Sequence, residues 1–182
     1  MNSKRLIRIS YFTMLTVIGA FIKIPLGSVS FTLQTLFVIT SGFILEAKDA
    51  FFSQIVYLIL GIIGLPVFSN GGGFSYALQP SFGYIVAFPL GAFLAGLLKS
   101  RLKVLSTLKL FVCGIIALLA VYLVGAIYQV LILIFLTKVS VSAAFLSLAF
   151  IGVYYIIDAV LIYLVALIHP RLMDTMRIKS EF

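Results

Sequence analysis

The feature that most constrains the fold of this chain is an apolar run between Lys109 and Lys138 that contains no charged residue. About 20 consecutive apolar residues span the hydrocarbon core of a bilayer as one helix, and shorter apolar runs recur along the sequence. Of all residues, 63% are hydrophobic and only 10% are charged, whereas soluble domains carry about 25% charged residues. The sequence therefore predicts an all-α integral membrane protein.

We predict six transmembrane helices that form one substrate-binding domain over residues 1–182. The predicted spans cover about residues 7–24, 33–46, 50–67 and 82–98, and the run between Lys109 and Lys138 holds the fifth. The last apolar stretch, about 141–176, is too long for one helix that ends at both bilayer faces. We interpret it as a short surface helix, about 141–153, followed by a spanning helix that begins near Ile157.

The basic residues predict the orientation of these spans. With a cytoplasmic N-terminus, eleven of the 13 Lys and Arg residues fall on the cytoplasmic side, and only Lys23 and Lys138 fall outside. This is the positive-inside pattern, so we expect both termini in the cytoplasm. The same pattern disfavours nucleic-acid binding, because the basic residues are divided among several short loops.

A glycine-rich loop, Gly64–Tyr84, separates two apolar runs and contains three consecutive glycines at 71–73. Irregular backbone at membrane depth is tolerated only where protein or a water-filled cavity satisfies its polar groups. The orientation places this loop outside, together with the loop at 25–35, which predicts a cavity open to the outside. The alternative is an ordinary extracellular turn.

Asp158 is the one acidic residue with apolar neighbours on both sides. An ionisable residue inside a membrane is a functional candidate; the alternative is an N-cap for the last spanning helix. Lys23 either snorkels to the headgroups or attracts an anionic ligand. Neutral amides near the outer half suit an uncharged guest that forms hydrogen bonds; they are Gln34, Asn70, Gln79 and Gln129.

Nothing in the sequence favours catalysis or a cofactor. His169 is the one histidine, which excludes a histidine-based metal cluster, and neither G-x-S-x-G nor H-E-x-x-H is present. We therefore expect a binding protein rather than an enzyme. A membrane enzyme acting on a lipid-like substrate and a stand-alone facilitator or channel are the alternatives.

Small residues recur in the first helix, where Thr16 and Ala20 have the small-xxx-small spacing that permits close helix contact in lipid. They pack inside the chain or form a face on which a partner docks. The residues in question are Ser10, Thr13, Thr16 and Ala20.

Taken in order, several segments resemble the substrate-binding S components of energy-coupling factor (ECF) transporters, and most closely the biotin-specific BioY family. Each motif alone is weak evidence for the resemblance, but their order along the chain is specific to the family. The segments are Ile18–Pro25, Phe31–Phe37, Gly61–Phe68, Gln79–Tyr84 and Val124–Tyr128.

The resemblance implies a six-helix protein that binds biotin from outside. It also implies a transmembrane coupling protein and two ATPases as partners, with the small residues of the first helix as the docking face. Biotin is then the transported ligand and no cofactor is expected. The substrate-binding residues implied are Phe31, Gln34, Asn70, Gly72, Gly73, Gln79, Tyr84, Tyr128 and Asp158.

The last helix departs from the family pattern Pro-Gly-Asp-x-x-Lys. Asp158 keeps the acid, which in the family meets the ureido ring, but Leu161 stands where the lysine is expected. A buried carboxylate needs a cation or several donors. Either the ligand carboxylate stays near Lys23 or Lys138, or the ligand is a different vitamin or a biotin-like compound.

Overall fold

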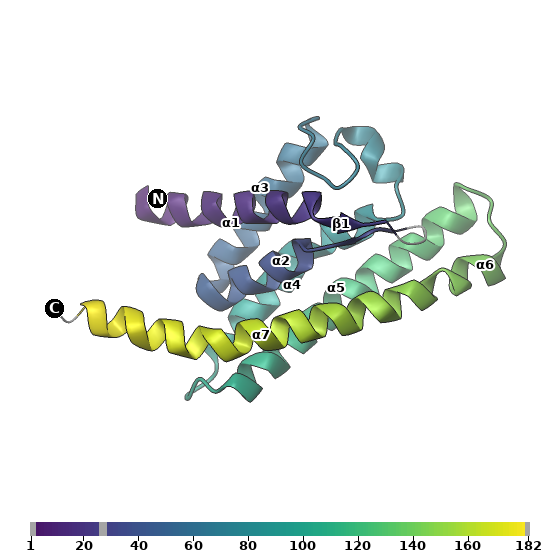
Figure 1. Ribbon diagram of the computed structural model, residues 1–182. Coiled ribbons are helices and arrows are strands. Elements are labelled where there is room, and N and C mark those ends of the chain that lie inside the picture. Colours follow the sequence, from purple (N-terminus) through teal and green to yellow (C-terminus); the bar gives the residue numbers. More distant parts are fainter. Residues whose placement is uncertain (1–2, 26–28, 181–182) are drawn as a thin grey trace.

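The computed structural model describes residues 3–25 and 29–180, with side chains described up to His169. Six longer helices and one short helix run through this part of the chain (Figure 1). They are α1 Ser3–Phe21, α2 Gln34–Ile44, α3 Ala47–Ile62, α4 Phe82–Ser100, α5 Thr107–Phe135, α6 Val141–Leu146 and α7 Leu148–Ser180. The six longer helices correspond to the six predicted spans, so the predicted fold class is confirmed.

Within the described residues, three stretches are long and apolar enough to span a membrane by themselves: Phe82–Ser100, Thr107–Phe135 and Val141–His169. The other long helices are shorter or begin with charge: α2 has 11 residues, α3 has 16, and α1 opens with basic residues. These weaker spans pack on one another, α1 against α2 and α3, and α4 packs against α2, α3 and α5. The helices that are too short or too charged to span a membrane alone are therefore held in the bundle by contacts with their neighbours.

The boundary predicted inside the last apolar stretch is wrong. The short helix α6 ends before Ser147, and α7 then continues without interruption past Ile157. The Ser147 hydroxyl donates to the carbonyl of Ala144 (2.6 Å), which satisfies an acceptor at the end of α6. No proline follows until Pro170, so nothing stops α7 near Ile157. Asp158 lies inside α7, and the N-cap interpretation of this residue is wrong.

A two-stranded hairpin that the sequence did not predict crosses one end of the bundle. Strand β1 (Lys23–Ile24) pairs antiparallel with β2 (Phe31–Thr32), with Lys23 opposite Thr32. Two-residue strands are too short to produce the alternating pattern by which strands are recognised. The hairpin lies at the opposite end of the bundle from the first turns of α1 and the last turns of α7 (Figure 1).

Three of the four residues of the predicted docking face on α1 are buried within the chain. Thr13, Thr16 and Ala20 are buried against the rest of the chain. The hydroxyl of Thr13 donates to the carbonyl of Ser53 on α3 (2.8 Å). The hydroxyl of Thr16 lies 3.3 Å from Oε1 of Gln54, also on α3. These contacts agree with internal packing, and the part of these residues in docking stays a prediction. Ser10 is exposed, and its part in docking stays a prediction.

At the end of the bundle away from the hairpin, side chains from α4 and α7 contact the C-terminus of α2. Lys99 Nζ donates to the carbonyls of Phe43 (2.9 Å) and Leu45 (3.2 Å). His169 Nε2 lies 2.8 Å from the same Phe43 carbonyl. Because a helix C-terminus leaves carbonyls unpaired and carries partial negative charge, a lysine there is stabilising. These contacts join α4 and α7 to the end of α2.

Candidate ligand cavity

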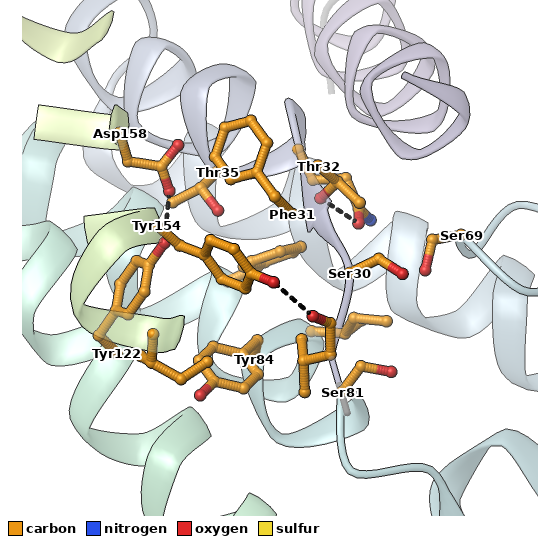
Figure 2. Close-up of a pocket in the computed structure, with 15 residues that line it drawn as sticks. Ser30, Phe31, Thr32, Thr35, Ser69, Ser81, Tyr84, Tyr122, Tyr154 and Asp158 are labelled. Atoms are coloured by element: carbon orange, nitrogen blue, oxygen red, sulfur yellow. Dashed lines mark hydrogen bonds between the residues drawn. The ribbon is translucent and has the colours of Figure 1, made fainter. Parts of the chain in front are cut away.

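A cavity lies at the hairpin end of the bundle, between α2, α4, α5 and α7 (Figure 2). The space within it, counted together with open solvent at the mouth, is about 470 Å³. Its polar lining is Ser30, Thr32, Gln34, Thr35, Ser69, Ser81, Tyr84, Tyr122, Tyr154 and Asp158. Its apolar lining is Val29, Phe31, Ile85, Phe88 and Ile151.

Asp158 is the charged residue of this lining, and it is 1% exposed. The Tyr122 hydroxyl on α5 donates to its Oδ2 atom (2.7 Å). Its Oδ1 atom makes no hydrogen bond to any residue that the structure describes, although the Thr35 side chain lies beside the carboxylate (Figure 2). A buried acceptor without a partner costs about 1–3 kcal/mol, so this oxygen is suited to a donor from a ligand.

Helical spacing explains why α7 presents this group to the cavity. Tyr154 precedes Asp158 by one turn and Ile151 precedes it by two, so the three share one face of α7. All three line the cavity. The opposite face of the same segment, with Val153 and Ile156, is exposed on the outside of the bundle, where lipid would lie.

The aromatic rings of the cavity are fixed by their hydroxyl groups. The Tyr84 hydroxyl donates to Gln129 Oε1 (2.9 Å), and the Tyr154 hydroxyl donates to the Val29 carbonyl (3.0 Å). The rings of Tyr154 and Phe31 lie 5.7 Å apart, centroid to centroid. Because Val29 and Phe31 belong to the hairpin segment, Tyr154 ties that segment to α7. The rings thus form a preset wall rather than a mobile one.

Gln34 is held on both sides of its amide. Its Oε1 atom accepts from the Thr32 hydroxyl (2.9 Å), and its Nε2 atom donates to the Tyr57 hydroxyl. Tyr57 in turn donates to the carbonyl of Val67 (3.1 Å) in the glycine-rich loop. This chain of hydrogen bonds connects the cavity lining on α2 with the loop.

The structure brings together four of the nine predicted substrate-binding residues around the cavity, namely Phe31, Gln34, Tyr84 and Asp158. The remaining five are not among its lining residues, and their contact with a ligand stays a prediction. These five are Asn70, Gly72, Gly73, Gln79 and Tyr128.

The glycine-rich loop contributes serines to the cavity instead of its glycines. Phe68 and Gly71 exchange backbone hydrogen bonds (2.9 and 3.1 Å), which puts Asn70 at an exposed turn tip and leaves Ser69 buried beside the cavity. At Gly72 an added Cβ would overlap the Leu65 carbonyl, so the close approach there is to the chain's own backbone. A short 3₁₀ helix, Phe74–Leu78, follows before Ser81 reaches the lining.

Tyr128 and Gln79 have structural surroundings outside the lining. The Tyr128 hydroxyl donates to the Ala77 carbonyl, and its ring lies 6.0 Å from that of Phe82. The side chain of Gln79 is exposed. Tyr128 therefore anchors the end of the glycine-rich loop on α5.

Sequence reasoning missed several lining residues, above all Tyr122, Tyr154 and Thr35. A signal existed for Tyr154, because it stands four residues before Asp158 and so must share its helix face. Tyr122 stands seven residues before Gln129, two turns along α5. Its link to Asp158 joins residues 36 positions apart, and helical spacing does not reach across two helices.

No group of three or more His, Cys, Asp or Glu residues that could hold a metal ion occurs in the described ranges. The cavity offers one carboxylate, several hydroxyls and an apolar wall. What this arrangement can do is bind a small, partly apolar molecule that donates hydrogen bonds at one end.

Comparisons with known proteins show which proteins this chain is similar to. A "probable biotin transporter BioY" of Lysinibacillus sphaericus is 45% identical over 123 residues, covering 68% of this chain but 63% of that relative's length. A protein of the same name from Pyrococcus horikoshii is 40% identical over 126 residues, covering 69% of this chain and 74% of the relative.

A solved structure is similar over nearly the full length. A crystal structure of the S-component for biotin from an ECF-type ABC transporter superposes with a TM-score of 0.79 at 27% identity, covering 96% of this chain and 95% of that one. The BioY family itself matches residues 1–178. The sequence motifs, the helical bundle and this match lead to one conclusion: the chain belongs to the BioY family.

Proposed function

We propose that this chain is the substrate-binding subunit of a biotin uptake system and holds biotin in the cavity at the hairpin end. The observation that carries the proposal is the buried Asp158 carboxylate, which lines the cavity with one oxygen unpaired among the described residues. Relatives named as biotin transporters and the similar S-component for biotin support the choice of ligand.

The chemistry of biotin fits the two kinds of lining. Its ureido ring carries two N–H donors, and one of them would donate to Asp158 Oδ1 in a charge-assisted hydrogen bond. Its fused rings and methylene chain are apolar and would lie against Phe31, Ile85 and Phe88. The ureido carbonyl is an acceptor for a hydroxyl such as that of Thr35. Binding without any covalent step would suffice for uptake.

We also infer that energy comes from partners. The membrane-enzyme alternative is removed, because the family is one of transporters. The likeness to a subunit of an ECF-type ABC transporter supports a transmembrane coupling protein and two ATPases as the partners. Affinity purification of the tagged chain from its native membrane should recover ATPase subunits; recovery of the chain alone would favour a stand-alone facilitator.

The orientation proposed has both termini in the cytoplasm and the cavity open to the outside. The basic residues support it, since the first turns of α1 and the connection from the last turn of α4 to α5 lie at the end of the bundle away from the hairpin (Figure 1). These segments carry Arg5, Lys99, Arg101 and Lys103. In intact cells, an impermeant thiol reagent should label a cysteine introduced at exposed Asn70 but not one introduced at exposed Lys103. The reverse labelling would contradict this orientation.

Equilibrium binding of radiolabelled biotin to the purified protein tests the ligand. We expect saturable binding at submicromolar biotin, displaced by unlabelled biotin and not by thiamine or riboflavin at 100-fold excess. Displacement by another vitamin and not by biotin would overturn the ligand while sparing the class of transporter. No saturable binding of any of these vitamins would contradict the proposed function.

A further inference from the structure

Lys23 lies at the rim of the cavity. It pairs with Thr32 across the hairpin, and its Nζ atom donates to the Ser69 carbonyl (2.6 Å) and to Asn70 Oδ1 (2.9 Å). Thr32 and Ser69 both line the cavity. The ammonium group is therefore next to lining residues from the hairpin and from the glycine-rich loop, while its own side chain is exposed.

The described lining of the cavity carries a negative group and no positive one. Asp158 contributes a carboxylate, and no Lys or Arg is among the described lining residues. Figure 2 shows Asp158 and Ser69 at opposite sides of the cavity. A ligand that carries a carboxylate would be repelled from the Asp158 side, since like charges in a poorly solvated site are unfavourable. Its acidic end must point toward the Ser69 side.

Position 161 does not supply the missing cation. Leu161 is absent from the described lining and packs partly buried against the hydrophobic core. Of the two outer lysines, Lys138 follows α5 and makes no hydrogen bond to a described lining residue, whereas Lys23 donates a hydrogen bond to the lining residue Ser69. The geometry thus singles out Lys23.

We propose that Lys23 is the carboxylate-binding residue of the cavity, with Asn70 as its support. This proposal rests on the proposed function, because it concerns the acidic tail of biotin. An ammonium group has three N–H donors; Ser69 and Asn70 take two, and the third is directed to the ligand carboxylate. The amide nitrogen of Asn70 is a further donor at the same place. The ureido ring and the carboxylate lie at opposite ends of biotin, as Asp158 and Ser69, the residue to which Lys23 donates, lie at opposite sides of the cavity.

This arrangement assigns a function to the exposed tip of the glycine-rich loop. Asn70 does not line the cavity, but through Lys23 it contributes to the site at the mouth. The alternative is that Lys23 only fastens the hairpin to the loop. The two roles differ in one respect: fastening is needed for any ligand, whereas charge pairing is needed only for a ligand that carries a carboxylate.

The test compares biotin with biotinamide, which keeps the ureido ring and lacks the negative charge. Wild-type protein should bind biotin about tenfold more tightly than biotinamide. In Lys23→Gln this preference should vanish: biotin affinity falls about tenfold and biotinamide affinity stays within about twofold. Lys23→Arg should keep most of the preference, and the control Lys138→Gln should keep all of it.

Equal losses for both ligands in Lys23→Gln would overturn the proposal and leave Lys23 as a fastening residue. Unchanged affinity for both would overturn it too. If wild-type protein binds biotin and biotinamide equally, the carboxylate has no partner and the proposal fails while the proposed function stands. If wild-type protein binds neither, both fail.

Discussion

Replacing Asp158 by Asn is expected to weaken biotin binding about 100-fold, or by about 2.7 kcal/mol. The wild-type carboxylate is 1% exposed, accepts one hydrogen bond from Tyr122 (2.7 Å) and has Oδ1 unpaired among the described residues. An asparagine has one acceptor oxygen and no negative charge. It cannot accept from Tyr122 and from a ureido N–H as strongly as the carboxylate does. Calorimetric titration with biotin measures the change.

A matched control uses Asp49, the second buried acid among the residues whose side chains the structure describes. Asp49 is 6% exposed and accepts a hydrogen bond from Arg5 Nε (2.6 Å) at the far end of the bundle. Asp49→Asn makes the same chemical change there, and it should leave biotin affinity within about twofold, whatever it does to stability. Equal affinity losses in the two variants would mean that Asp158 acts through the fold and not on the ligand.

Replacing Gly125 by Ala is expected to weaken biotin binding by at least about tenfold, because it displaces the Tyr84 ring that lines the cavity. A Cβ at this position on α5 would overlap the ring of Tyr84. That ring is 8% exposed and is held by the hydrogen bond to Gln129 (2.9 Å) and by edge contact with Tyr122, 5.7 Å away. Adding a methyl group to a well-packed site costs about 1–3 kcal/mol. To make room for it, the Tyr84 ring must move into the cavity or give up its hydrogen bond to Gln129.

Gly152 provides the control for this variant. It lies in α7 beside Ile151, but an added Cβ there meets nothing within 4 Å. Gly152→Ala should therefore keep biotin affinity and raise stability slightly, since Ala is favoured over Gly in a helix by up to about 1 kcal/mol. Thermal unfolding in detergent, run beside the titrations, separates the two effects. Full biotin affinity in Gly125→Ala would contradict the role given to the Tyr84 wall.

The spans were predictable because their signal is local. A run such as that between Lys109 and Lys138 demands a spanning helix whatever its neighbours are, and α5 fills it. Asp158 was predictable as a site residue for the same reason, since one acid in an apolar segment stands out in the sequence. Where the helix around it begins was not predictable, because the break at Ser147 depends on side-chain hydrogen bonds to α6 and to Gln129 on α5.

The composition of the glycine-rich loop did not predict which of its residues line the cavity. Its glycines suggested close approach to a ligand, but Gly72 approaches the backbone at Leu65 and the loop presents Ser69 to the cavity. Which face a loop residue shows depends on contacts distant in sequence, such as Lys23 with Asn70. The contacts of Thr13 and Thr16 with α3 could not be predicted for the same reason.

The most direct test of the central claim, that Asp158 receives a ureido N–H group, is a thermodynamic cycle on ligand and protein. Two isosteric biotin analogues each replace one ureido N–H by oxygen. Wild-type protein should bind at least one of them about 100-fold more weakly than biotin, and in Asp158→Ala this difference should shrink below about threefold. A difference that remains about 100-fold without the carboxylate would contradict the account.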